Sequence, residues 1–118
     1  AKILVVDDDA VGLEVIVHFL QINGHTCSQA ANASEARHLL NTMEFNLVIT
    51  DQHMPGESGL QLLSYVFANF SHIAGIVITG SNDCRVQSKA SEIGALACMK
   101  KPFCLEELLD AISAIIQA

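Results

Sequence analysis

Three consecutive acidic residues, Asp7, Asp8 and Asp9, directly follow the apolar run Ile3–Val6. Carboxylates beside buried strands repel one another, so they stay protonated, pair with cations or hold a metal ion. No Cys–His cluster lies near them in the sequence, and oxygen ligands alone select a hard divalent cation. Asp7 and Asp8 therefore predict a site for Mg²⁺ or Mn²⁺, whereas Asp9 is placed to cap the helix that follows.

Asp51, Thr79 and Lys101 stand at or just beyond the ends of three later apolar runs. A carboxylate such as Asp51 can act as a nucleophile toward phosphorus and form an acyl phosphate. Attack by an anion on an anionic phosphoryl group requires charge neutralisation, which a divalent ion and the Lys101 ammonium can supply. Thr79 can donate a hydroxyl hydrogen bond to a phosphoryl oxygen. The combination predicts phosphoryl chemistry.

These side chains need a scaffold that brings their segments together, and the pattern of apolar runs supplies one. Five short runs alternate with five helical patterns, which predicts an α/β fold with strands buried on both faces and helices on both sides of a parallel sheet. In such a sheet the site lies outside the carboxyl ends of the strands. The predicted strands are Ile3–Val6, Cys27–Ala30, Leu47–Thr50, Ile76–Thr79 and Leu96–Met99.

The helical patterns carry start and stop signals of their own. Asn32 with Glu35 three residues later forms a capping box, and Gly24 and Gly94 are placed to end helices. Residues 105–116 show a regular 3.6-residue apolar period. The predicted helices begin near Asp9, Asn32, Ser58, Asp83 and Leu105, and the first and fourth end near Asn23 and Ile93.

The first predicted helix has an unusually wide apolar surface. Its polar residues, Glu14, His18 and Gln21, form one narrow stripe, with Val11 and Val15 beside it. A surface helix needs only about a 100° apolar face. The helix is therefore either nested deeply in the fold or has apolar edges that are exposed or covered by a partner.

The composition narrows the class of protein. The chain has 118 residues, 51% hydrophobic and 16% charged, which suits one globular domain and excludes disorder. The net charge is −7 and no basic run is present, so we expect no direct nucleic-acid binding. The apolar stretches are too short to insert in a membrane. The four cysteines form no C-x-x-C pair, and reduced thiols predict a cytoplasmic location.

Short motifs follow one another along the chain: Leu4-Val5-Val6-Asp7-Asp8, Asp51 with Met54-Pro55-Gly56 and Gly59-Leu60, Thr79-Gly80, Gly94-Ala95 and Lys101-Pro102-Phe103. This ordered set covers the whole chain, residues 1–118, and resembles a receiver domain of two-component response regulators, the CheY-like family. The chain begins at Ala1 and stops within a helical pattern, so we expect a domain excised from a longer protein. The resemblance implies a (βα)5 doubly wound, flavodoxin-like fold with strand order 2-1-3-4-5.

The resemblance also implies roles for individual residues. Asp51 is the phosphoacceptor, Lys101 pairs with the phosphoryl group, and Thr79 is the switch hydroxyl. The peptide between Lys101 and Pro102 is usually cis in this family. The Mg²⁺ ligands are Asp7, Asp8, Asp51 and the backbone carbonyl of His53.

The partners implied by the resemblance are a histidine kinase or histidine phosphotransfer protein as donor and an output domain in the same full-length chain. A homodimer through the fourth helix, fifth strand and fifth helix is a further expectation. The chain would then be a signalling phosphoacceptor that catalyses only its own phosphorylation and dephosphorylation, not an enzyme in the usual sense.

Two other positions bear on how such a domain switches. Cys98 stands where the family commonly has an aromatic residue that moves with the switch threonine. A single sulfur atom cannot sweep that volume, so we expect phosphorylation to move mainly the segment Asn82–Val86. His53 borders the expected path of the hydrolytic water, and its side chain either tunes the phosphoryl lifetime or is a solvated rim histidine.

Two alternatives stay open from the sequence. The first is an interaction module that keeps the fold without phosphorylation, although the intact Asp7, Asp8, Asp51, Thr79 and Lys101 argue against it. The second is a small phosphohydrolase with an aspartyl nucleophile. Such enzymes usually carry a second acid two residues after the nucleophile, and that residue is His53 here.

Overall fold

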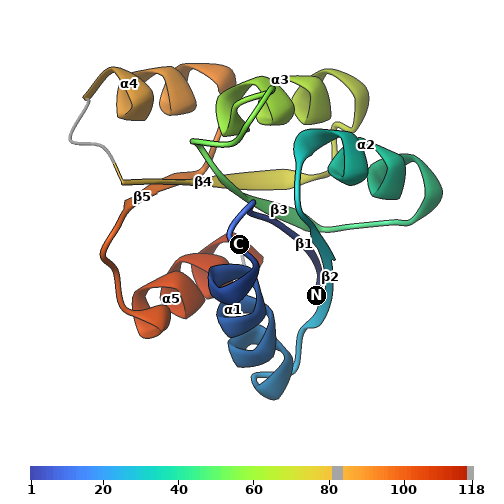
Figure 1. Ribbon diagram of the computed structural model, residues 1–118, viewed down its shortest axis with the longest axis vertical. Coiled ribbons are helices and arrows are strands. Elements are labelled where there is room, and N and C mark those ends of the chain that lie inside the picture. Colours follow the sequence, from blue (N-terminus) through green and yellow to red (C-terminus); the bar gives the residue numbers. More distant parts are fainter. Residues whose placement is uncertain (81–83, 117–118) are drawn as a thin grey trace.

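A single parallel sheet organises the molecule in the computed structural model, which describes residues 1–80 and 84–116. The strand order is β2-β1-β3-β4-β5, as the resemblance implied. Helices α2, α3 and α4 cover one side of the sheet, and α1 and α5 cover the other (Figure 1). The strands are β1 (Lys2–Val6), β2 (Thr26–Ala30), β3 (Leu47–Asp51), β4 (Ala74–Thr79) and β5 (Ala97–Lys100), and the helices are α1 (Ala10–Ile22), α2 (Ala33–Thr42), α3 (Gly59–Asn69), α4 (Cys84–Ile93) and α5 (Leu105–Ile116).

The central strands divide their side chains between two cores, because successive residues of a strand point to opposite faces. Leu4 and Val6 of β1 pack with the α2–α4 side, whereas Ile3 and Val5 pack with the α1–α5 side. Residues of β3 and β4 alternate in the same way. The apolar runs in β1, β3 and β4 are therefore continuous, as the sequence predicted for strands buried on both faces.

The prediction of burial on both faces is wrong for β2 and β5. Thr26 and Gln29 of β2 are exposed, and β5 has no fully buried residue. Both strands lie at the edges of the sheet, where helices cover them incompletely. β5 also begins one residue later than predicted, which leaves Leu96 outside the strand and exposed.

Helix caps agree with the sequence at three helices. The side chains of Asp9 and Asn32 accept backbone N–H groups at the starts of α1 and α2. The Glu35 side chain accepts the N–H of Ala31 at 3.0 Å and not that of the cap residue Asn32, so the capping box predicted at α2 is only half formed. Ser58 and Gln61 form a reciprocal capping box at α3. The predicted start of the fourth helix, Asp83, lies outside the described residues.

The structure decides between the two interpretations of α1. Leu13, Ile16, Val17 and Leu20 are buried against the sheet and α5. The opposite edge is open: Val11 is 72% exposed, Val15 50% and Ile22 68%. These three residues help to line a surface groove of about 620 Å³. The helix therefore has an exposed apolar edge and is not deeply nested.

The helices of the described ranges, 1–80 and 84–116, are short. None of them is both long enough and apolar enough to cross a membrane. The longest, α1, has 13 residues, against the roughly 20 that a spanning helix needs.

Candidate functional site

The ends of β1 and β3 bring three carboxylates together. Asp7 and Asp8 follow β1 directly, and Asp51 is the last residue of β3, its neighbour in the sheet. One ligand atom from each residue lies within 4.8 Å of the others. Asp7 and Asp51 are buried, whereas Asp8 is exposed. Three oxygen donors at this spacing, one of them open to solvent, fit a hydrated divalent cation such as Mg²⁺.

The carboxyl group of Asp7 is subject to several opposing electrostatic effects. Burial raises the pKa of its carboxyl group, and the charges of Asp51 and Asp8 act in the same direction. The N–H of Asp9 donates to Asp7 Oδ1 at 3.0 Å, and this hydrogen bond and the charge of Lys101 oppose the rise. Burial is the largest cause of the upward shift, and a cation bound beside Asp7 would oppose it by favouring the charged carboxylate.

Lys101 supplies the neighbouring positive charge. Its Nζ lies 3.5 Å from Asp51 Oδ2 and 4.0 Å from Asp7 Oδ2. The backbone N–H of Lys101 donates to the carbonyl of Thr79 at 2.8 Å, which ties the end of β5 to the end of β4. The peptide to Pro102 is cis, as expected from the resemblance. The Lys101 side chain is 40% exposed, so its ammonium can contact a ligand as well as Asp51.

Thr79, the last residue of β4, is buried beside the same group of side chains. Its Oγ1 lies 3.4 Å from Nε2 of His53. The sequence indicated a position for the His53 side chain near the site but did not predict this contact, because His53 lies in the loop after β3 and Thr79 ends β4, 26 residues later. The role of the His53 carbonyl as a metal ligand stays a prediction.

Gln52, which the sequence did not single out, and Gly59, from the motif Gly59-Leu60, hold the backbone next to Asp51. Gln52 Oε1 accepts the N–H of Leu60 at 2.8 Å, and the N–H of Gln52 donates to the carbonyl of Ile78 at 2.7 Å. A Cβ atom at Gly59 would lie 2.4 Å from the carbonyl oxygen of Asp51. Gly59 therefore permits the start of α3 to press against the backbone of Asp51.

The expected switch region is described only in part. Cys98 is partly buried and packs against the core on the α2–α4 side. Burial raises the pKa of its thiol. Of the segment Asn82–Val86, in which we expected movement, residues 82 and 83 lie outside the described part of the chain. The expected movement stays a prediction.

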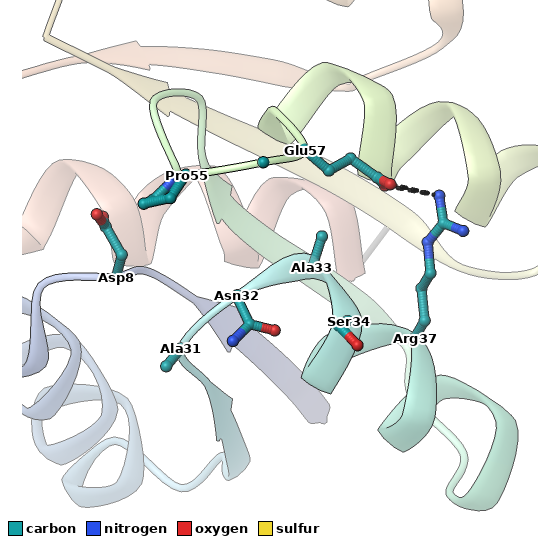
Figure 2. A pocket seen from close by; sticks show the side chains of 9 residues that line it. Asp8, Ala31, Asn32, Ala33, Ser34, Arg37, Pro55 and Glu57 are labelled. Carbon is teal, nitrogen blue, oxygen red and sulfur yellow. Dashed lines mark hydrogen bonds and ion pairs between the residues drawn. The ribbon is translucent and has the colours of Figure 1, made fainter.

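A surface hollow of about 520 Å³ opens beside the carboxylates. Asp8 lies on one side of it, the segment Pro55–Glu57 lies opposite, and Arg37 closes one end (Figure 2). The first residues of α2 form the floor between them. The exposed carboxylate of Asp8 is thus accessible through this hollow, which the loop between β3 and α3 borders.

Comparison with known proteins gives consistent results. A family model for the response regulator receiver domain matches residues 3–113. Protein PetR of Rhodobacter capsulatus is 35% identical over 115 residues, which are 98% of this chain and 48% of PetR. Sporulation initiation phosphotransferase F of Bacillus subtilis is 30% identical over 112 residues, 94% of this chain and 90% of that protein.

The similarity extends to three dimensions. The structure of response regulator protein TrrA from Thermotoga maritima, in complex with Mg²⁺ and BeF, matches with a TM-score of 0.87 and 28% identity, covering 97% of both chains. The chain spans about half the length of PetR and of several other curated relatives.

Proposed function

Because the chain belongs to the response regulator receiver domain family, we propose that it accepts a phosphoryl group on Asp51 from a phosphohistidine donor. One observation carries the proposal: the carboxylates of Asp7, Asp8 and Asp51 meet at one edge of the sheet, with the Lys101 ammonium 3.5 Å from Asp51. This arrangement combines a nucleophile, a place for a divalent cation and a fixed positive charge.

In the proposed reaction a carboxylate oxygen of Asp51 attacks phosphorus, and an O–P bond forms while the P–N bond to the donor imidazole breaks. The electron pair of the broken bond stays on the imidazole nitrogen. Mg²⁺ bound by Asp7, Asp8 and Asp51 would neutralise charge between the attacking carboxylate and the phosphoryl oxygens. Lys101 and the hydroxyl of Thr79 would contact phosphoryl oxygens.

The side chain of His53 is placed to affect the lifetime of the acyl phosphate. It lies 3.4 Å from Thr79 Oγ1, on the loop that follows Asp51. From this position the imidazole would limit the approach of water to the phosphoryl group. The proposed role is control of hydrolysis, not of phosphoryl transfer.

The exposed edge of α1 is the proposed docking site for the donor, a histidine kinase or a histidine phosphotransfer protein. Val11, one turn from Asp8, begins an apolar strip that continues through Val15 to Ile22. A donor helix laid in this groove would bring its histidine toward Asp51. The further partners in the proposal are an output domain in the full-length chain and a second copy bound through α4, β5 and α5.

Phosphorylation itself is tested by incubating the chain with acetyl phosphate and Mg²⁺ and measuring its intact mass. We expect one added phosphoryl group, absent from Asp51→Ala and retained in Asp110→Asn, which removes an exposed acid of α5. A wild-type chain that gains no phosphoryl group would indicate an interaction module instead. Continuous phosphate release from many phosphate esters would indicate a phosphohydrolase.

The metal assignment is tested separately by thermal unfolding. A ligand that binds only the folded state stabilises it by mass action, by about 1.4 kcal/mol at ten times its Kd. We expect Mg²⁺ to raise the midpoint of wild-type unfolding and to leave Asp8→Ala unchanged. An equal shift in both proteins would contradict the assignment.

A further inference from the structure

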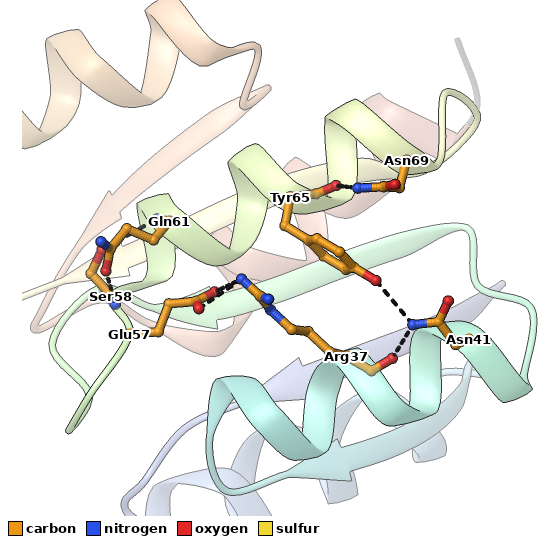
Figure 3. A network of polar contacts seen from close by, with 7 residues as sticks. All are labelled: Arg37, Asn41, Glu57, Ser58, Gln61, Tyr65 and Asn69. Atoms are coloured by element: carbon orange, nitrogen blue, oxygen red, sulfur yellow. Dashed lines mark hydrogen bonds and ion pairs between the residues drawn. The ribbon is translucent and has the colours of Figure 1, made fainter.

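A network of polar contacts joins α2, the loop between β3 and α3, and α3 itself (Figure 3). Nη2 of Arg37 on α2 donates to both carboxylate oxygens of Glu57 in the loop, each at 2.7 Å. The same guanidinium lies over the ring of Tyr65 on α3, 4.4 Å from the ring centroid. Asn41 Nδ2 donates to Tyr65 Oη at 2.9 Å and to the carbonyl of Arg37 at 2.7 Å.

The Arg37 guanidinium is held more firmly than in an ordinary surface ion pair. An isolated exposed pair contributes little, because two long side chains lose entropy when they are fixed in one geometry. Here the ring of Tyr65 restricts the guanidinium, and Asn41 in turn holds Tyr65. Nε of Arg37 is buried without a hydrogen-bond partner among the described residues, and the contacts that hold the guanidinium are those to Glu57 and Tyr65.

Glu57 belongs to the loop that leaves the proposed phosphorylation site. At the start of this loop Gln52 forms hydrogen bonds with Ile78 of β4 and Leu60 of α3, and at its end Ser58 caps α3. Arg37 adds an attachment to α2 between these ends. The loop segment Pro55–Glu57 also borders the hollow that contains Asp8 (Figure 2).

We propose that Arg37 is a positioning residue for the carboxylate site: by holding Glu57 it fixes the loop after Asp51 and so prepares the site for Mg²⁺. The inference rests on the proposed function, since it concerns the same metal. A loop that is already ordered loses less freedom when a ligand binds, and affinity rises accordingly. A small displacement of this ordered loop on binding would be passed through Glu57 and Arg37 to the ring of Tyr65 on α3.

The test compares Arg37→Met with Glu57→Gln by calorimetric titration of the metal-free chain with Mg²⁺. Both variants release the loop, so we expect each to weaken Mg²⁺ binding roughly three- to tenfold. Their charge changes are opposite. If only long-range electrostatics mattered, Arg37→Met would strengthen binding of the cation and Glu57→Gln would weaken it.

Matched controls come from an exposed pair on α4. Nζ of Lys89 lies 4.0 Å from Glu92 Oε2, and both side chains are largely exposed. Lys89→Met and Glu92→Gln repeat the same charge changes away from the loop, and we expect the Kd to stay within twofold of wild type. The double variant Arg37→Met/Glu57→Gln should be no weaker than the weaker single variant, because both substitutions remove one interaction.

A spectroscopic readout needs no substitution in the network. Tyr65 is the single tyrosine, and the chain has no tryptophan, so intrinsic fluorescence reports directly on the ring that contacts Arg37. We expect Mg²⁺ to change the emission of the wild-type chain and to have no effect on Asp8→Ala. Glu57→Gln should keep less than half of the wild-type change at saturating Mg²⁺.

The outcomes separate the two proposals. If wild type binds Mg²⁺, Asp8→Ala does not, and both network variants bind as wild type does, the positioning role is wrong and the metal site stands. Opposite effects of Arg37→Met and Glu57→Gln would also overturn the positioning role. If wild type binds no Mg²⁺, the metal part of the proposed function fails together with the inference.

Discussion

The two sides of the sheet are built differently (Figure 1). On the α2–α4 side, small residues such as Ala33, Ala36 and Ala90 lie in the core, and Arg37 cross-links α2 to the loop beside the site. On the α1–α5 side the core consists largely of leucine, isoleucine and valine, and α1 leaves an apolar strip exposed. In our two proposals, one side holds the loop of the site in place and the other offers a surface to the phosphoryl donor.

The largest expected effect is a loss of stability at Gly59, on the α2–α4 side, and Gly12 on the α1–α5 side is its control. In Gly59→Ala, at the start of α3, the new Cβ would meet the backbone oxygen of Asp51 at 2.4 Å, so we expect a loss of about 3 kcal/mol in unfolding free energy. In Gly12→Ala, on α1, the nearest atom is Oδ2 of Asp9 at 3.2 Å, which can yield by a few tenths of an ångström because the cap hydrogen bond is made by the other oxygen, Oδ1.

For Gly12→Ala we expect a change within about 1 kcal/mol, with the better helix propensity of alanine favouring stabilisation. Urea unfolding of the two variants measures both values. Similar losses in both would show that the start of α3 is no more tightly packed against the site than α1 is.

The second prediction concerns the exposed strip of α1. Val15→Glu should slow phosphoryl transfer from a protein donor by about tenfold, because it places a charge in the centre of the apolar groove. Transfer from acetyl phosphate should be unchanged. Met43→Glu is the control: it places the same charge on an exposed apolar residue at the end of α2.

We expect Met43→Glu to behave as wild type with both donors. Equal slowing of Val15→Glu with the protein donor and with acetyl phosphate would mean that the substitution had damaged the fold. Slowing by Met43→Glu as large as that by Val15→Glu would place the docking surface on the other side of the sheet.

The third prediction concerns Asp7, at the edge of the sheet where the carboxylates meet. Burial raises the pKa of Asp7 above its ordinary value of 3.8, so the folded state binds a proton more readily than the unfolded state does. The associated stability is present below pH 3.8 and is lost as the pH rises through the folded pKa. In the absence of metal, Asp7→Asn should therefore unfold a few degrees above wild type at pH 7.

The advantage of Asp7→Asn over wild type should shrink as the pH is lowered toward 3.8, where wild-type Asp7 becomes protonated as well. Thermal unfolding of both proteins at a series of pH values from 7 down to about 3.5 measures the difference. A difference that grows on acidification would contradict the upward shift.

The smallest effect is expected within the network of the α2–α4 side. Tyr65→Phe removes the hydroxyl that accepts from Asn41 but keeps the ring under Arg37, so the loss should be about 0.5–1 kcal/mol. Asn41→Ala is the partner for a double-mutant cycle. Fully additive losses in the cycle would show that the hydroxyl and the amide are not coupled.

Several features of the fold were predictable because they depend on neighbours in the sequence. Asp9, Asn32 and Ser58 cap helices through atoms two or three residues away, and Gly24 and Gly94 adopt positive φ where helices end. The burial of β2 was wrongly predicted because its place at the edge depends on which strands pair, a property of the whole sheet.

By itself the sequence determined that Asp7, Asp8, Asp51 and Lys101 would gather, because parallel strands bring their carboxyl ends to one edge of a sheet. The tertiary structure alone decided the pairing of Arg37 with Glu57, 20 residues apart, and the contact of His53 with Thr79, 26 residues apart. It also decided the close approach of Gly59 to Asp51. Periodicity and capping report on local hydrogen bonds and burial, whereas these contacts depend on distances between packed elements, which no local pattern encodes.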